Sequence, residues 1–168
     1  MVENQGFHTV RGYEILGKKR AVLSPSMEDY LEMIYRLLQK KGYVRAVDLA
    51  EALKVQPSSV TRMIQKLDEC GFIYYEKYRN VGLTPLGEKY GKFLAWRDEM
   101  LKEFFRLLNA KTDVEEQVEG IEHYITPNTM SLIRNLVNYF NQNLDRLKEF
   151  KTIQSQGEYP DGEKLVAL

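Results

Sequence analysis

Apolar residues repeat at intervals of three and four along most of this chain, which is the spacing of an amphipathic α-helix. The first stripe follows Ser24-Pro25, a serine cap with proline at the first helical position, and predicts a helix that runs to about Lys41. Shorter stripes predict a helix from Ala46 to about Leu53 and another from Pro57 to Cys70-Gly71. The segment Lys54–Gln56 between them is short enough for a tight turn.

The pattern changes after the third helix. Phe72–Tyr78 is rich in aromatic residues and, with Arg79–Thr84, predicts a two-stranded hairpin that turns around Arg79-Asn80. Every later apolar stripe is helical and predicts three more helices, namely Thr84-Pro85 to about Leu108, Val114–Tyr124 and Pro127–Phe150.

This order of elements predicts a mainly α protein. Three helices and a two-stranded wing form a winged helix-turn-helix, and an all-helical dimerisation domain follows. The expected organisation is an N-terminal arm (1–22), the winged helix-turn-helix (23–84), a helical metal-binding and dimerisation domain (85–150) and a polar C-terminal tail (151–168).

Charge and cysteine content limit the range of functions that this chain could have. Basic and acidic residues balance at 24 each, yet residues 1–110 carry 18 basic and 14 acidic side chains, whereas residues 111–168 carry 6 and 10. The halves therefore stand at +4 and −4, which suits a DNA-facing front and a cation-binding back. Cys70 has no partner for an internal disulfide, and the absence of a long apolar run predicts a cytoplasmic protein without a membrane partner.

The third predicted helix offers a surface for DNA. Once Val60, Met63, Ile64 and Leu67 are assigned to the core, a polar face is left, made of Ser58, Ser59, Thr61, Arg62, Gln65 and Lys66. Small hydroxyls near a helix N-terminus suit phosphate oxygens, and longer donors reach base edges in a major groove. The tip of the wing would add Lys77, Tyr78 and Arg79. A merely solvated face, or a winged helix used only for protein contacts, is the alternative.

A second constellation points to metal. Glu119, Glu122 and His123 stand at i, i+3 and i+4, which places them on one face of the fifth predicted helix. The first helix offers Asp29 and Glu32, again three residues apart. Carboxylates with one imidazole suit a six-coordinate ion of intermediate hardness such as manganese(II), and loading would draw repelling carboxylates together. Taken singly, each acidic cluster could be a solvated helix face.

Four stretches of the sequence resemble the diphtheria toxin repressor family of metal-dependent regulators. They are Ser24–Tyr30 (SPSMEDY), Gln56–Thr61 (QPSSVT), Tyr75–Arg79 (YEKYR) and Val118–His123 (VEGIEH), within a match over about Leu23–Phe150. The resemblance implies a homodimer that binds a palindromic operator when loaded with metal and represses metal-uptake genes. It also implies a cluster of two manganese(II) ions per subunit, ligated by Asp29, Glu32, Glu119, Glu122 and His123.

The resemblance also bears on the choice of metal. Iron-responsive relatives carry methionine where Asp29 stands and cysteine where Glu119 stands, so the hard-oxygen version found here favours manganese. An iron-responsive repressor of the same family remains the alternative, and other divalent metals stay open.

Asp98 departs from the family pattern. The family places a histidine ligand on the long helix that is predicted here from Thr84-Pro85 to about Leu108. With Asp98 the candidate ligands carry −5 against +4 from two manganese(II) ions, whereas a neutral imidazole would leave −4. Three explanations follow: the site binds its cations more electrostatically, Asp98 ligates through water, or only one ion is held firmly. Alternatively, Asp98 pairs with Arg97 or with another surface cation.

Two other functions are alternatives to the repressor. A metal-independent winged-helix regulator of the multiple-antibiotic-resistance type would share the fold and not respond to manganese. A metallohydrolase is disfavoured because the sequence has no nucleophile-and-base pair or phosphate loop, so the chain is not expected to be an enzyme. The arm before residue 23 has two open roles, contact with DNA or with a partner subunit, and its His8 is not an expected ligand.

Overall fold

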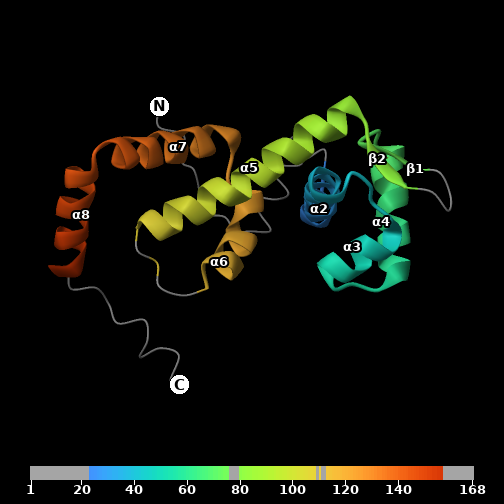
Figure 1. Ribbon diagram of the computed structural model, residues 1–168, viewed down its shortest axis with the longest axis horizontal. Coiled ribbons are helices and arrows are strands. Elements are labelled where there is room, and N and C mark those ends of the chain that lie inside the picture. Colours follow the sequence, from blue (N-terminus) through green and yellow to red (C-terminus); the bar gives the residue numbers. More distant parts are fainter. Residues whose placement is uncertain (1–22, 76–79, 109, 111–112, 157–168) are drawn as a thin grey trace, which may run out of the picture. The chain divides into compact units, whose positions relative to one another are not determined.

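The computed structural model describes residues 23–75, 80–108, 110 and 113–156, and divides into two compact units, Met1–Leu94 and Ala95–Leu168 (Figure 1). The first unit contains α2 (Pro25–Lys41), α3 (Ala46–Leu53), α4 (Pro57–Glu69), β1 (Ile73–Tyr75) and β2 (Val81–Leu83). Helix α5 (Pro85–Leu107) begins in the first unit and ends in the second. The second unit continues with α6 (Val114–Ile121), the 3₁₀ turn η1 (Glu122–Tyr124), α7 (Pro127–Gln142) and α8 (Leu144–Gln156).

The helices of the first unit begin and end where the sequence predicts. The Ser24 side chain accepts a hydrogen bond from the Met27 amide at 3.4 Å, and Gly42 ends α2 at φ 75°. Lys54 takes a left-handed conformation at φ 54° between α3 and α4, which allows the Val55 amide to bond to the Ala50 carbonyl. This tight turn makes α3 and α4 a helix-turn-helix pair.

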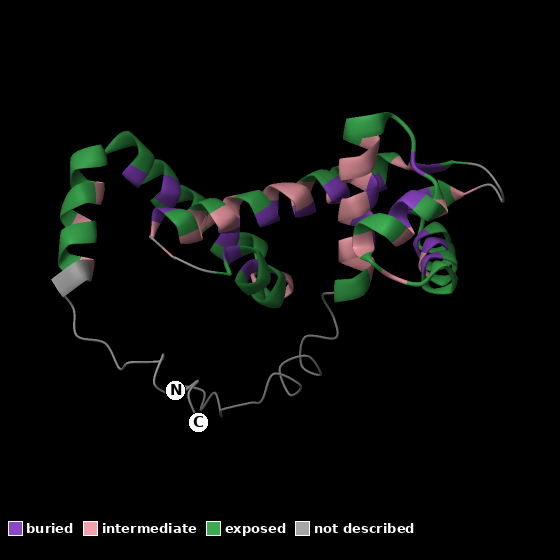
Figure 2. Cartoon of the chain, turned by 60° about the horizontal axis from the view of Figure 1, so that its bottom comes forward, coloured by how far each residue is buried: buried purple, intermediate pink, exposed green. Residues whose placement is uncertain are grey.

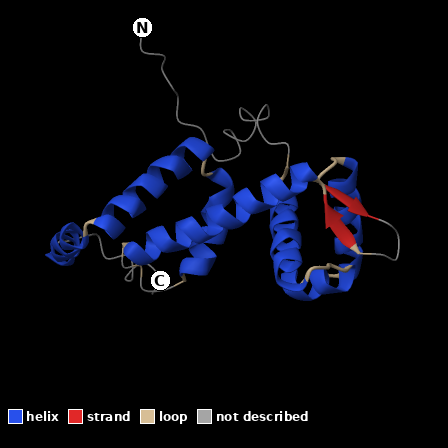
Figure 3. Cartoon of the chain, turned by 45° about the horizontal axis from the view of Figure 1, so that its top comes forward, coloured by secondary structure: helices blue, strands red, loops and turns tan. Residues whose placement is uncertain are grey.

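The two strands form an antiparallel hairpin, drawn in red in Figure 3, in which Ile73 pairs with Leu83 and Tyr75 with Val81. The Val81 amide also donates to the Val44 carbonyl at 2.8 Å, which ties the wing to the segment between α2 and α3. The predicted mainly α fold, a winged helix-turn-helix followed by helices, is therefore confirmed. The turn residues 76–79 lie outside the described residues.

One apolar core holds the first unit together. Figure 2 shows buried positions, in purple, alternating with exposed green faces along its helices. Side chains from α2, α3, α4 and the wing are at most 2% exposed, among them Leu31, Ile34, Leu49, Val60, Ile64, Leu67 and Phe72. Burying one such side chain stabilises the fold by about 1.5–3 kcal/mol. The core stripe of α4 thus fixes which of its faces points outward.

Asp48 links α2 to α3 and carries a pH prediction. A hydrogen bond from Lys41 at 3.0 Å, helped by Arg45, lowers the pKa of the Asp48 carboxyl from 3.8 to about 2. Because the pKa is lower in the folded state, the ionised Asp48 carboxylate stabilises the fold above about pH 4. This contribution disappears as the pH falls through 2. Because Lys41 and Arg45 are themselves exposed, we expect Asp48→Asn to cost about 1–2 kcal/mol at pH 7.

Urea unfolding followed by circular dichroism would check this. The difference between wild type and Asp48→Asn should shrink towards zero between pH 4 and pH 2, whereas Glu51→Gln, at an exposed position of the same helix, should show little difference throughout. A pH-independent difference would contradict the assignment.

The second unit differs from the prediction at two points. The predicted helix Val114–Tyr124 ends at Ile121, whose φ of −118° leaves the α-helical range, and η1 follows. The predicted helix Pro127–Phe150 is two helices, because Asn143 between α7 and α8 adopts φ −131° and ψ 67°. Both breaks depend on the conformation of a single residue, which an apolar stripe does not reveal.

Two small clusters form the core of the second unit. One contains Leu101, Val114, Val118 and Met130, and the other contains Leu107, Val137 and Phe140. Through these clusters α6 and α7 pack against the second half of α5. Across the described part of the chain, no helix combines the length and apolar character that a membrane span requires.

Candidate metal centre and nucleic-acid interface

Helix α4 presents the polar face that the sequence predicts. Val60, Ile64 and Leu67 are fully buried, and the six residues left over are all exposed, namely Ser58, Ser59, Thr61, Arg62, Gln65 and Lys66. The Thr61 hydroxyl donates to the Pro57 carbonyl at 3.1 Å, which keeps that side chain close to the helix. The face therefore carries short side chains near the N-terminus of α4 and long hydrogen-bond donors farther along. This is the arrangement expected of a recognition helix. Lys77, Tyr78 and Arg79 lie outside the described residues.

The first unit contributes two of the predicted metal ligands, both on α2. Asp29 and Glu32 are partly buried. Glu32 accepts a hydrogen bond from Arg36 Nε at 2.7 Å, one turn later on the same helix. Glu32 therefore already has a cationic neighbour within its own helix.

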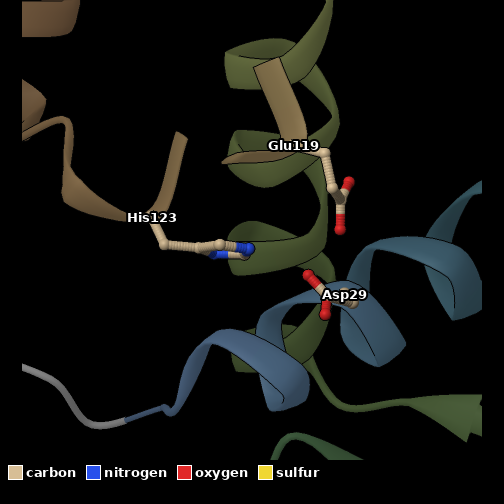
Figure 4. Close-up of side chains that lie close together, drawn as sticks. All are labelled: Asp29, Glu119 and His123. Atoms are coloured by element: carbon tan, nitrogen blue, oxygen red, sulfur yellow. The ribbon is translucent and has the colours of Figure 1, made fainter. Parts of the chain in front are cut away.

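The second unit brings Glu119 and His123 together. Their metal-ligating atoms lie within 4.8 Å of each other, although Glu119 belongs to α6 and His123 to η1. Figure 4 draws both side chains, and also Asp29 of α2 from the first unit. The predicted single helical face is thus replaced by a helix end and a 3₁₀ turn, which still place the Glu119 carboxylate and the His123 imidazole beside each other.

Glu122 lies deeper than these two residues and contacts an arginine. Glu122 and Arg97 are each 3% exposed, and Arg97 Nη2 lies 3.3 Å from Glu122 Oε1. The same nitrogen lies 3.3 Å from Nδ1 of His123. Arg97 is therefore an internal counter-ion of the Glu122–His123 pair.

Asp98 forms an ion pair with Lys102. The ammonium nitrogen of Lys102 lies 2.7 Å from Oδ1 and 2.9 Å from Oδ2 of Asp98, one turn apart on α5. Asp98 is 7% exposed. Of the alternatives for Asp98, a cationic partner is thus present, namely Lys102.

From the sequence, a surface cation was an alternative partner for Asp98, but Lys102, Arg36 and the contacts of Arg97 were not identified. The i, i+4 spacings of Glu32 with Arg36 and of Asp98 with Lys102 were readable signals of ion pairs. Arg97 gave no such signal, because its partners lie 25 and 26 positions later in the chain.

The donors fit a divalent first-row ion. Carboxylate oxygens with one imidazole nitrogen are the ligands that manganese(II) and iron(II) take, and a soft thiolate is absent because the lone cysteine, Cys70, lies exposed at the end of α4. Such an ion would offset the mutual repulsion of the carboxylates.

An exposed recognition helix and a carboxylate–imidazole set in one chain define a metal-dependent DNA-binding repressor. Residues 22–81 match the family described as iron dependent repressor, N-terminal DNA binding domain, and residues 84–151 match its metal binding and dimerisation domain. The chain belongs to this family, which confirms the resemblance found in the four sequence stretches.

Similar proteins are named as regulators. The HTH-type transcriptional regulator MntR of Bacillus velezensis is 48% identical over 138 residues, which cover 82% of this chain and 97% of that protein. MntR of Bacillus subtilis is 47% identical over 137 residues, covering 81% and 96%. These names confirm the prediction that the chain is a regulator and not an enzyme.

Solved structures agree with this assignment. The IdeR of T. acidophilum is 27% identical with a TM-score of 0.57, covering 71% of this chain and 55% of that one. The manganese regulator SloR is 26% identical with a TM-score of 0.55, covering 70% and 55%. The chain therefore spans about half the length of these two solved proteins.

Proposed function

We propose that this protein is a manganese-responsive repressor of metal-uptake genes that binds a palindromic operator as a homodimer. The observation that carries the proposal is the donor set itself, in which carboxylates and one imidazole gather, with no cysteine among them in the described part of the chain. A structural relative described as a manganese regulator supports the choice of ion.

The proposed ligands are Asp29, Glu32, Asp98, Glu119, Glu122 and His123. Asp29 and Glu32 belong to the first helix of the DNA-binding unit, whereas the other four belong to the second unit. An ion held by ligands from both units would fix how the recognition helix is presented, because the ion replaces repulsion between carboxylates with attraction. Metal loading would thus control DNA binding.

The proposed dimer is supported by an apolar stripe on α7. Leu132 is 61% exposed, Leu136 41% and Tyr139 49%, and their spacing puts them on one face of the helix. Exposed large apolar residues at helical spacing mark a protein contact. A two-fold symmetric pair of such faces would present two copies of α4 to the two halves of a palindrome.

The DNA-binding half of the proposal is tested on Arg62, the longest donor at the centre of the exposed face of α4. We expect Arg62→Ala to weaken binding by about 5- to 150-fold, the loss of about 1–3 kcal/mol that removal of a base contact causes. The measurement is fluorescence anisotropy with manganese present, on DNA selected from a random pool by the manganese-loaded protein.

Arg134→Ala is the matched control, since it removes the same exposed side chain from α7. Arg134→Ala should bind like wild type, and manganese binding should be unchanged in both variants. Equal affinities for Arg62→Ala and wild type would show that this face does not read DNA.

A further inference from the structure

We propose that Lys102 takes the place of a second metal ion, so that each subunit binds one divalent cation. This inference rests on the proposed function, because it requires that the carboxylate set binds metal. It assigns a role to a residue that is not itself a ligand, and it limits the proposed ligand role of Asp98 to a second ion that binds only when Lys102 is removed.

The contact between Lys102 and Asp98 carries the inference. The ammonium lies 2.7 Å from one oxygen of Asp98 and 2.9 Å from the other, so it faces both oxygens that the side chain can offer to a metal. The side chains are 22% and 11% exposed. A pair so far removed from water is screened less than an ordinary surface ion pair, and its charges persist as near neighbours.

Lys102 changes what Asp98 can do for a metal. A neutral imidazole at this position would offer a lone pair without a negative charge that attracts the Lys102 ammonium. Asp98 would instead hold an incoming divalent ion next to the Lys102 ammonium, and the Coulomb repulsion between them is twice that between two single charges. Asp98 is therefore a weak ligand as long as Lys102 is charged.

The charges at the site lead to the same conclusion. Three cations each contact one of its carboxylates: Arg36 with Glu32 at 2.7 Å, Arg97 with Glu122 at 3.3 Å, and Lys102 with Asp98 at 2.7 Å. Within the second unit, Asp98 and Glu122 thus each have a cation beside them, so two of its three candidate carboxylates already have their charge offset. A second divalent ion in this unit would have to bind beside these cations, which is unfavourable away from water.

The test counts manganese on the full chain after removal of metal with a chelator. Equilibrium dialysis gives the number bound, and electron paramagnetic resonance distinguishes isolated ions from an exchange-coupled pair. Wild type is expected to bind about one ion per subunit, and Lys102→Gln about two, with a coupled spectrum. Lys102→Arg keeps the charge and should stay at about one. Lys92→Gln, at an exposed position of the same helix, is the control and should also stay at about one.

The double variant Asp98→Asn/Lys102→Gln should return to about one ion, because the second ion needs the Asp98 carboxylate. Two ions on wild type, or one ion on a folded Lys102→Gln variant, would overturn the inference and leave the proposed function standing. If Lys102→Gln does not fold, the wild-type count decides alone. A folded wild type that binds no manganese would contradict the proposed function itself.

Discussion

Glu119→Gln is expected to weaken manganese binding by about 100-fold or more, and manganese-dependent DNA binding with it. Even residues that only support a ligand cost 10- to 100-fold when they are changed, and Glu119 is a proposed ligand. The substitution keeps the size of the side chain and replaces a charged oxygen donor by a neutral amide. Because Glu119 is exposed, its loss should leave folding intact.

Glu116→Gln is the matched control, since it removes the same charge from an exposed position of α6, three residues earlier. Isothermal titration with manganese should show a large loss of affinity for Glu119→Gln and none for Glu116→Gln. Equal losses of affinity would mean that the overall negative charge of α6 attracts the ion, rather than ligation by Glu119.

Gly87→Ala is expected to destabilise the protein by about 3 kcal/mol or more. A Cβ atom at Gly87 would lie 1.8 Å from the Phe72 carbonyl oxygen and 2.8 Å from its carbon. That carbonyl accepts hydrogen bonds from the amide and the hydroxyl of Thr84, both at 3.1 Å, and Phe72 is 1% exposed. The added Cβ atom would therefore clash with buried, hydrogen-bonded backbone, and moving that backbone aside costs much free energy.

Gly120→Ala provides the comparison, because a Cβ atom there would meet nothing within 4 Å. It should be neutral or stabilise α6 by up to about 1 kcal/mol. Thermal unfolding without metal would measure both, and the Gly87→Ala midpoint should fall by about 6–12 °C. A fall smaller than that of an ordinary surface substitution would mean that α5 begins farther from the wing than described.

Four of the predicted helices begin at a proline, and the structure confirms each of these starting points. Pro25, Pro57, Pro85 and Pro127 each stand at the first position of an observed helix. Proline has the backbone angle of a helix and lacks only an amide that would be unbonded there, so the signal is local and strong. The exposed face of α4 was predictable for a similar reason, because its core stripe repeats without interruption.

The breaks in the second unit were not predictable in this way. Ile121 and Asn143 interrupt predicted helices without a proline or glycine at either position. Apolar periodicity continues through Asn143, because Phe140 of α7 and Phe150 of α8 pack in the same small cluster. A stripe therefore shows that residues pack together, and not that one helix carries them.

The candidate metal ligands were found from residue type and spacing, whereas their counter-ions were not. Glu122 was predicted to share a helical face with Glu119 and His123, and the structure buries it against Arg97. That contact joins α5 to η1, and only the fold brings such distant positions together. The contact of Asp98 with Lys102 is local, and its i, i+4 spacing was present in the sequence.

The most direct test of the account is the affinity of the wild-type protein for its selected DNA as manganese is added. We predict that affinity rises at least tenfold from chelator to saturating manganese(II), that magnesium at the same concentration does not reproduce the rise, and that chelator reverses it. An affinity that is the same with chelator and with manganese would contradict the claim that this protein is a metal-dependent repressor.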